Sequence, residues 1–273
     1  MPADAAKIKA KVEAQGLELR NWNIQINYGI KTGLNEAFII DNTTRNAIIE
    51  NSPKSAEIIR PILRGRNISP YVANYNDLWL INSHNGIKEK GILPIDVKNN
   101  YPVIYDHFMK FREKLIRRQD KGDHWTNLRN CAYIEEFDKP KIIYPNMTKY
   151  LPFVYDKGSY FTNQKCFIIT GHYLGYLTAF FNSNLFKYCF RENFPELLGG
   201  TRELSKIFFF YFCVKTGDEK TESDFLSLVN KIQDCKLNGM NTVDLEMLVE
   251  KKLSELYQLS DEEFNLVSSF KID

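Results

Sequence analysis

The sequence predicts an α+β protein, made of a mixed-sheet domain followed by a C-terminal helical segment. Up to residue 217, short runs of alternating or continuous apolar residues, typical of strands, are mixed with apolar residues at helical spacing. From Glu222 onward only the helical spacing remains, as in Phe225, Val229 and Ile232.

The amino-acid composition is that of a globular protein. The 273 residues can bury a sizeable core, and 44% hydrophobic with 26% charged residues is ordinary for a globular protein. The net charge of +2 does not by itself indicate a nucleic-acid partner. The five cysteines and four histidines are dispersed, so we expect reduced thiols and no metal site. No apolar run approaches twenty residues and no signal peptide is present, so a soluble cytoplasmic protein is expected.

The first twenty residues are expected to form a charged linker helix. Ile8, Val12 and Leu19 lie on one side of it, which is a thin apolar face. Such a helix is either peripheral or the end of something longer, and we expect the chain to be part of a larger protein.

Residues 21–41 contain two predicted strands joined by a glycine-flanked loop. The alternation at 24–28 predicts one strand and the apolar run at 37–40 predicts another. Lys31 and Thr32 lie between two glycines in what should be a tight loop. The pair is therefore a candidate binding element, and the alternative is an ordinary hairpin turn with a solvated lysine.

A helix is predicted over residues 53–63, because Pro53 suits the first turn of a helix. Arg64 and Arg66 flank a glycine at its end, and Asn67 follows. Planar arginine forks suit phosphate groups and guanine edges, so these three residues are candidates for contact with nucleic acid. The alternative is that the arginines bond the final carbonyls of the helix.

A short buried strand at 78–81 and a helix at 102–115 precede a mixed basic loop. The loop contributes the candidates Arg117, Arg118, Lys121, His124, Trp125 and Arg129. Basic side chains next to an aromatic ring suit a phosphate backbone and a stacked base. The alternative is a solvated loop with Trp125 tucked beneath it.

The remaining elements follow from the same patterns. They are an edge strand at 139–146 marked by prolines, a hairpin at 153–161, a buried strand at 165–170, an apolar helix at 172–191, a glycine-broken loop at 197–204 and an aromatic strand at 207–214. Asn146, Lys149 and Tyr150 follow the edge strand, and Arg202 lies in the glycine-broken loop, so all four are further candidates.

Catalytic motifs are absent from the sequence. It contains no GxGxxG after a strand, no phosphate-binding loop, no GxSxG and no HExxH. An unrecognised enzyme would need titratable groups converging around His84, His124 or His172. We expect no catalytic residue and no metal site in this chain.

Taken together, the segments resemble the C-terminal specificity (target recognition) domain of TaqI-like and type IIG restriction–modification methyltransferases. The matching segments are YGIKTGLNEAFIID (Tyr28–Asp41), PKSAEIIRPILRGRNISPY (Pro53–Tyr71), WLI (Trp79–Ile81), KPKIIYPN (Lys139–Asn146), YFTNQKCFIITG (Tyr160–Gly171), YLTAFFNSNLF (Tyr176–Phe186), GGTRELSK (Gly199–Lys206) and the helical tail LSELYQLSDEEF (Leu253–Phe264). The family often has aspartate where this chain has Asn67.

The resemblance implies a division at 1–20 (linker helix), 21–217 (target recognition domain) and 218–273 (C-terminal helical segment). It also implies a module that reads double-stranded DNA for a methyltransferase or endonuclease domain of the same parent protein. In such enzymes S-adenosylmethionine and an adenine-binding Asn-Pro-Pro-Tyr motif belong to the catalytic half, which this sequence lacks. We therefore expect no cofactor in this chain. The alternative is a protein-interaction module that docks a partner through its C-terminal helices.

Overall fold

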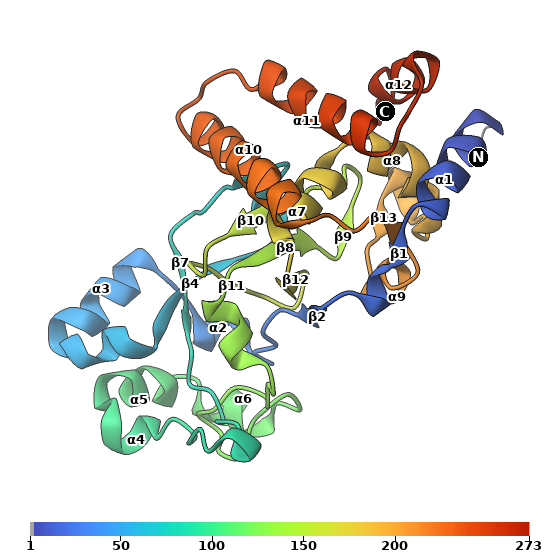
Figure 1. Ribbon diagram of the computed structural model, residues 1–273. Coiled ribbons are helices and arrows are strands. Elements are labelled where there is room, and N and C mark those ends of the chain that lie inside the picture. Colours follow the sequence, from blue (N-terminus) through green and yellow to red (C-terminus); the bar gives the residue numbers. More distant parts are fainter. Residues whose placement is uncertain (1–2, 273) are drawn as a thin grey trace.

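The computed structural model describes residues 3–272 and has a four-stranded sheet at its centre (Figure 1). Its strands, in the order β10, β8, β12, β2, are Val154–Asp156, Lys141–Pro145, Cys166–Gly171 and Ile24–Tyr28, and every neighbouring pair is antiparallel. The continuous apolar sequence of β12 follows from this position, because its side chains are buried on both faces of the sheet.

A second four-stranded sheet is built from segments between residues 39 and 162. Its strands, in the order β11, β4, β7, β3, are Phe161–Thr162, Ile59–Leu63, Leu78–Ile81 and Ile39–Asp41. The pairing of β11 with β4 is parallel, and the other two pairings are antiparallel. Three short pairs complete the strands: β1 (Leu17–Glu18) with β14 (Cys213–Val214), β5 (Ile68–Ser69) with β6 (Val72–Ala73), and β9 (Met147–Thr148) with β13 (Arg202–Glu203).

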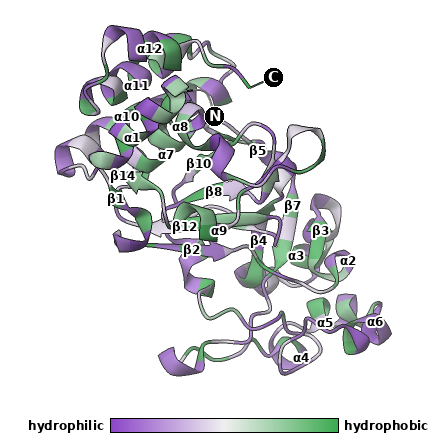
Figure 2. Ribbon diagram, turned by 90° about the vertical axis from the view of Figure 1, so that its right-hand side faces the viewer, coloured by the Kyte–Doolittle hydropathy of each residue, from purple (hydrophilic) through white to green (hydrophobic). Residues whose placement is uncertain are grey.

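Helices cover the two sheets at opposite ends of the molecule. Near the second sheet lie α2 (Asn35–Phe38), α3 (Asn42–Asn51), α4 (Val97–Asn100), α5 (Pro102–Met109) and α6 (Arg112–Arg117). The other end contains α1 (Ala3–Ala14), α7 (Leu174–Asn182), α8 (Asn184–Phe190), α9 (Lys206–Phe209), α10 (Glu219–Leu237), α11 (Val243–Leu256) and α12 (Asp261–Ser268). Figure 2 shows α10–α12 at one end and α4–α6 at the other, with the central strands between them. Short 3₁₀ turns join several elements, among them η2 (Pro53–Ile58), η3 (Gly65–Asn67), η6 (Arg191–Asn193) and η7 (Leu198–Gly200).

The central sheet separates two hydrophobic cores. Tyr144 and Phe167 belong to the core shared with the helices α1, α7, α8 and α10–α12. Their chain neighbours Ile143 and Ile168 belong to the core shared with the second sheet and α3–α6. Since successive side chains of a strand point to opposite faces, the two inner strands β8 and β12 contribute to both cores.

The N-terminal helix packs more firmly than its sequence indicates. Ile8 and Val12 are fully buried in the first core, where α1 packs against α8 and β14. The ammonium group of Lys11 also pairs with the Glu263 carboxylate of α12 at 2.6 Å. The predicted boundaries at residues 20 and 217 stay a prediction, although α1 and α10–α12 share a core with the central sheet.

Two predicted hairpins are wrong. In each of them, the two strands belong to different sheets and do not pair with each other. β2 pairs with β12 of the central sheet, whereas β3 pairs with β7 of the second sheet. In the same way β10 pairs with β8, and β11 pairs with β4. Both segments are crossings between the sheets rather than tight turns.

Three other elements differ from their predictions. The helix predicted over 53–63 is limited to the turn η2, and the chain then extends as β4, where the apolar residues enter the second core. The strand at 139–146 is confirmed, but it lies inside the sheet between β10 and β12, so its prolines mark ends and not an edge. The aromatic strand predicted at 207–214 begins as helix α9, which brings the rings of Phe209 and Phe212 to 5.6 Å in one aromatic cluster.

The remaining predictions agree with the structure in outline. The helices predicted at 102–115 and 172–191 are each divided in two, the second at Ser183, which caps α8. The α+β class and the C-terminal helices are confirmed. None of the helices between residues 3 and 272 is both long enough and apolar enough to cross a membrane.

Candidate nucleic-acid interface

One end of the central sheet brings three loop segments together. Strands β2 and β8 end there and β12 begins. The amide of Gly29 donates to the carbonyl of Cys166 at 2.9 Å, and the amide of Asn146 donates to that of Lys165 at 2.8 Å. A Cβ atom at Gly29 would lie 1.9 Å from the carbonyl oxygen of Asn163, so only glycine permits this approach. Candidates from distant parts of the sequence are therefore neighbours at this end.

The turn η3, which contains Arg66 and is preceded by its N-cap Arg64, packs on the same end of the sheet. A Cβ atom at Gly65 would lie 3.2 Å from the carbonyl oxygen of Lys165 and 3.3 Å from Cβ of Pro145. Asn67 is buried and shapes the turn, since its side-chain oxygen accepts a hydrogen bond from the Arg64 amide at 2.8 Å. Asn67 thus has a clear structural role, and a contact with DNA stays a prediction for it.

The two arginines of this turn remain available to a ligand. Arg66 is exposed and Arg64 is half-buried, and within residues 3–272 neither guanidinium group forms an ion pair. Burial lowers the pKa of Arg64 from its ordinary value, and the charge of Arg66 lowers it further. The turn therefore concentrates two positive charges that the fold itself does not neutralise.

Lys31 and Arg129 converge on a single carboxylate. Lys31 Nζ lies 2.9 Å from Asp120 Oδ2, and Arg129 Nη1 lies 3.0 Å from Asp120 Oδ1. The hydrogen bond from Lys31 is the main cause that holds the pKa of Asp120 below its ordinary value. Two cations on one acid leave a net positive cluster. Thr32 is buried next to it and donates to the side-chain oxygen of Asn35 at 2.7 Å.

Arg118 has its guanidinium group inside the fold. It donates to the carbonyl oxygens of Thr32 at 3.0 Å, of Trp125 at 3.2 Å and of Asn127, and it lies 4.5 Å from the centre of the Phe38 ring. Burial lowers the pKa of Arg118 to about 10, so the group is still charged at neutral pH. These bonds join the basic loop to the Lys31 segment.

The rest of the basic loop is mixed in charge. His124 Nδ1 lies 2.7 Å from the hydroxyl of Thr126, and the half-buried Trp125 packs against Tyr105. The loop borders a groove of about 420 Å³ whose lining includes Asp96 and Asp123 as well as His124. Arg117 and Lys121 are exposed, and Lys121 donates to a carbonyl of α6. The acids make this groove less suitable for a phosphate backbone than the end of the sheet.

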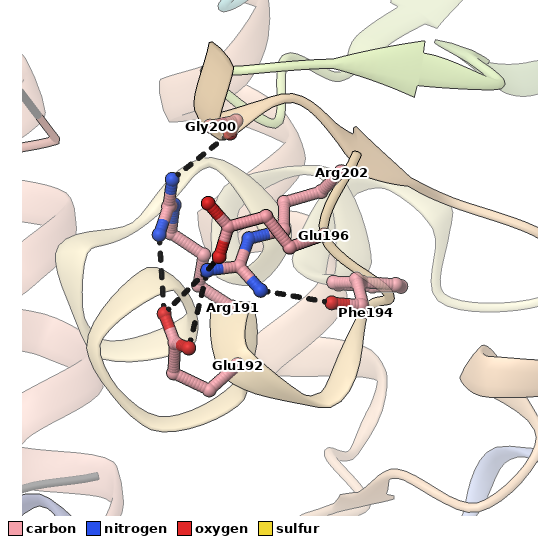
Figure 3. A network of polar contacts seen from close by, with 6 residues as sticks. All are labelled: Arg191, Glu192, Phe194, Glu196, Gly200 and Arg202. Atoms are coloured by element: carbon pink, nitrogen blue, oxygen red, sulfur yellow. Dashed lines mark hydrogen bonds and ion pairs between the residues drawn. The ribbon is translucent and has the colours of Figure 1, made fainter. Parts of the chain in front are cut away.

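The β9–β13 ribbon continues from the same end of the sheet. Asn146 accepts a hydrogen bond from the Leu204 amide at 2.7 Å, and its buried side-chain oxygen has no partner within the described residues. Lys149 Nζ lies 5.7 Å from the centre of the Tyr150 ring, which is exposed. Arg202 is buried and used within the fold, where it pairs with two glutamates (Figure 3).

Three residues at this end were not among the sequence candidates. Lys165 is exposed directly before β12, and Tyr28 is exposed at the end of β2. Lys206 Nζ lies 5.9 Å from the centre of the Tyr28 ring. For Lys165 and Tyr28 the position at a strand end is a usable signal, since side chains at the ends of neighbouring strands meet at one edge of a sheet, whereas Lys206 begins helix α9.

We call this surface the basic strip. It consists of Tyr28, Lys31, Arg64, Arg66, Arg129, Lys149, Lys165 and Lys206. At the opposite end of the sheet the charges are paired. Lys141 and Asp156 form a buried ion pair at 2.6 Å, and Lys139 pairs with Glu136 at 2.6 Å. Cations beside an exposed aromatic ring at this end of the sheet suit contact with a phosphodiester backbone.

Two of the four histidines are held by hydrogen bonds within the fold. His84 Nδ1 accepts a hydrogen bond from the Gly86 amide, and burial lowers its pKa. His107 is buried and lies 2.9 Å from the carbonyl oxygen of Ala37. Among residues 3–272, no group of three or more histidine, cysteine, aspartate or glutamate side chains is arranged to hold a metal ion.

Comparison with known proteins identifies a family that this chain matches and solved structures with a similar fold. The family model of the TaqI-like C-terminal specificity domain matches residues 60–208. A search of curated proteins finds no match.

Two solved structures share the fold at low sequence identity. The type IIL restriction–modification enzyme MmeI, solved in complex with DNA, aligns with a TM-score of 0.61 and 12% identity over 93% of this chain and 37% of that one. The type IIG restriction endonuclease BpuSI aligns with a TM-score of 0.56 and 11% identity over 84% of this chain and 28% of that one. The chain therefore spans little more than a third of the first relative and less than a third of the second.

Proposed function

The chain belongs to the family of TaqI-like C-terminal specificity domains and is a DNA target-recognition module, and we propose that it binds double-stranded DNA along the basic strip. The observation that carries this proposal is the gathering of cations at one end of the central sheet. Six of the eight strip residues lie within the stretch matched by the family model: Arg64, Arg66, Arg129, Lys149, Lys165 and Lys206.

Different members of the strip suit different tasks. The arginine turn presents planar forks on a backbone held by Asn67, and such forks match the two acceptors of a guanine edge. Each correct pairing of this kind contributes about 1–3 kcal/mol of discrimination. Lys165 and the Lys31 cluster carry compact charges that suit phosphate contacts, which position the duplex without reading it.

The module serves a catalytic half that is not in this chain. In this proposal an adenine-specific methyltransferase domain of the same parent protein binds S-adenosylmethionine, with or without an attached endonuclease. The chain reads the target site, and the partner domain performs the chemistry on a base taken out of the stack. The proposed location of the parent protein is the cytoplasm.

A selection from random duplexes tests the proposal directly. The chain is incubated with the pool at low and at physiological salt, and the bound fraction is sequenced. An enriched motif that survives the higher salt is the expected result, because base contacts depend less on counterion release than phosphate contacts do. Salt-sensitive binding without enrichment would remove sequence reading from the proposal.

Variants then locate the surface. We expect R64A and R66A to relax the preference at individual positions, and K165A to weaken all sequences alike and reduce the salt slope by about 1. D120N should strengthen the binding of all sequences and increase the salt slope, because it releases Lys31 and Arg129 for phosphate contacts. R60A is the matched control, since Arg60 lies outside the strip and is 4.0 Å from Asp138. If these strip variants bind as R60A does, the strip is not the DNA surface.

A second candidate function is docking of a partner subunit through the C-terminal helices. The turn between α10 and α11 exposes Leu237, Met240 and Val243, which favours a protein contact there. Absence of DNA binding at both salt concentrations would leave this function as the better account. An L237D/V243D variant that no longer binds the catalytic half would support it.

A further inference from the structure

A short loop projects from the β9–β13 ribbon and exposes two neighbouring leucines, Leu197 in part and Leu198 at its tip almost completely. The Leu197 amide donates to the carbonyl of Thr201 at 2.7 Å, and Glu196 bridges to Arg202, so the loop closes like a small hairpin. Leu198 at the tip is 97% exposed, the highest value among the exposed large hydrophobic residues between positions 3 and 272. Because the side chain is almost completely exposed, its burial by a partner would be favourable.

The base of the loop is held by a network of two arginines and two glutamates (Figure 3). Arg202 Nη2 lies 2.9 Å from Glu192 and 3.0 Å from Glu196, and its Nη1 donates to the carbonyl of Phe194 at 3.1 Å. Arg191 donates to the carbonyl of Gly200 at 3.1 Å. The leucine is therefore presented on a fixed support and not on a loose loop.

The tip itself is narrow. Gly199 and Gly200 have φ of +72° and +75°, which glycine adopts without strain, and a Cβ atom at Gly199 would meet nothing within 4 Å. Two leucines beside two glycines still expose far less apolar surface than the roughly 800 Å² per partner that a stable protein interface buries. The shape of the tip suits insertion into a narrow gap better than docking on a protein surface.

The loop also lies next to the basic strip. Lys149 Cε is 3.8 Å from the Cβ position of Gly200, and the ribbon itself starts after Asn146 at the end of the sheet. A positive charge therefore borders the tip, and the exposed ring of Tyr150 lies beside that lysine. Proteins that kink DNA commonly insert an apolar side chain between base pairs while nearby cations hold the phosphates.

We propose that Leu198 is a wedge that enters a base-pair step of the bound duplex and unstacks it. This inference rests on the proposed function, because it requires a duplex on the basic strip. The deformation would add sequence preference at a step that no polar side chain reads, since flexible pyrimidine–purine steps open most easily.

The test uses the full chain and duplexes that carry the selected motif, with 2-aminopurine placed at one position after another. Unstacking raises the fluorescence of this base. We expect a severalfold rise at one step with the wild type, its loss with L198A, and its retention with L198F. L93A is the matched control, because Leu93 is also an exposed leucine, at 79%, but lies outside the strip.

The outcomes separate the two proposals. Motif-specific binding by the wild type without a rise at any position overturns the wedge and leaves the proposed function intact. A rise that persists in L198A overturns it as well. If L198A leaves the rise unchanged and instead weakens association with the methyltransferase half, the loop is a protein contact. Failure of every duplex to bind refutes the proposed function itself.

Discussion

Arg118 and Arg117 are adjacent arginines with opposite surroundings. Arg118 is buried and donates to three carbonyl oxygens, whereas Arg117 is exposed at the end of α6. A buried guanidinium group that is bonded to several carbonyl oxygens holds a loop in place and is not available to bind a ligand. Arg118 therefore positions Lys31 and the basic loop, while its neighbour stays a candidate for direct contact.

We predict that R118A lowers the free energy of unfolding by about 2–4 kcal/mol, because three carbonyl groups that are buried or partly buried lose their donor. R118K should recover little, since one ammonium group cannot reproduce the planar fork. Urea unfolding checks both values, with R117A as the control, which should change the stability by less than about 0.5 kcal/mol. Equal stability of R118A and R117A would contradict the role assigned here.

At the scale of elements, helix α7 depends on α10 for its N-terminal cap. Tyr173 precedes α7 with φ of +58° and provides no side-chain cap. Glu222 of α10 takes that place, and its carboxylate accepts from the amides of Gly175 at 2.9 Å and Tyr176 at 2.8 Å. The two helices approach closely, since a Cβ atom at Gly175 would lie 2.5 Å from Leu226 Cβ.

We predict that E222A lowers the free energy of unfolding by about 1–3 kcal/mol, because two amides at the start of α7 lose their acceptor. Burial raises the pKa of Glu222 above its ordinary 4.5, so the folded state binds this proton more tightly than the unfolded state. The resulting stabilisation is complete below pH 4.5 and is lost as the pH rises through the folded pKa. E222Q should remove this pH dependence.

Urea unfolding of both variants and the wild type across that pH range measures the effect. The matched control is E219Q, which changes an exposed carboxylate in the first turn of the same helix. An E222Q curve parallel to that of the wild type would show that the slope arises elsewhere.

At the scale of the whole molecule, the central sheet couples the two cores. Phe167 faces one core and Ile168 faces the other, on adjacent positions of β12. Loss of this strand would open both cores together. The helical end and the second sheet should therefore unfold as one unit. We expect this even though α10–α12 and α4–α6 lie at opposite ends of the molecule in Figure 1.

We predict coincident unfolding transitions for Trp22, which lies in one core, and Trp79, which packs on the other, when each is followed as the sole tryptophan. I168A should lower both transitions together by about 2–5 kcal/mol, because it leaves a cavity in the shared sheet. I207A, at an exposed residue, is the control. A shift confined to the Trp79 signal would indicate two independent units.

The sequence by itself determined the α+β class, the buried strand β12 and the C-terminal helices, and it named five of the eight residues of the basic strip as candidates. These features depend on local information: alternation or continuity of apolar residues, helical spacing, and glycines next to basic residues. The family resemblance follows from the same segments, and the match over residues 60–208 confirms it. The individual DNA contacts of the candidate residues stay predictions.

Only the tertiary structure decided which strands pair and which cations are consumed within the fold. β2 and β3 carry strand patterns, but no local pattern says that they belong to different sheets. Arg118 and Arg202 resemble Arg64 and Arg66 in sequence, yet the first two are buried against carbonyls and glutamates. The physical reason is that local patterns report burial and backbone conformation, whereas pairing and charge neutralisation depend on residues distant in the chain.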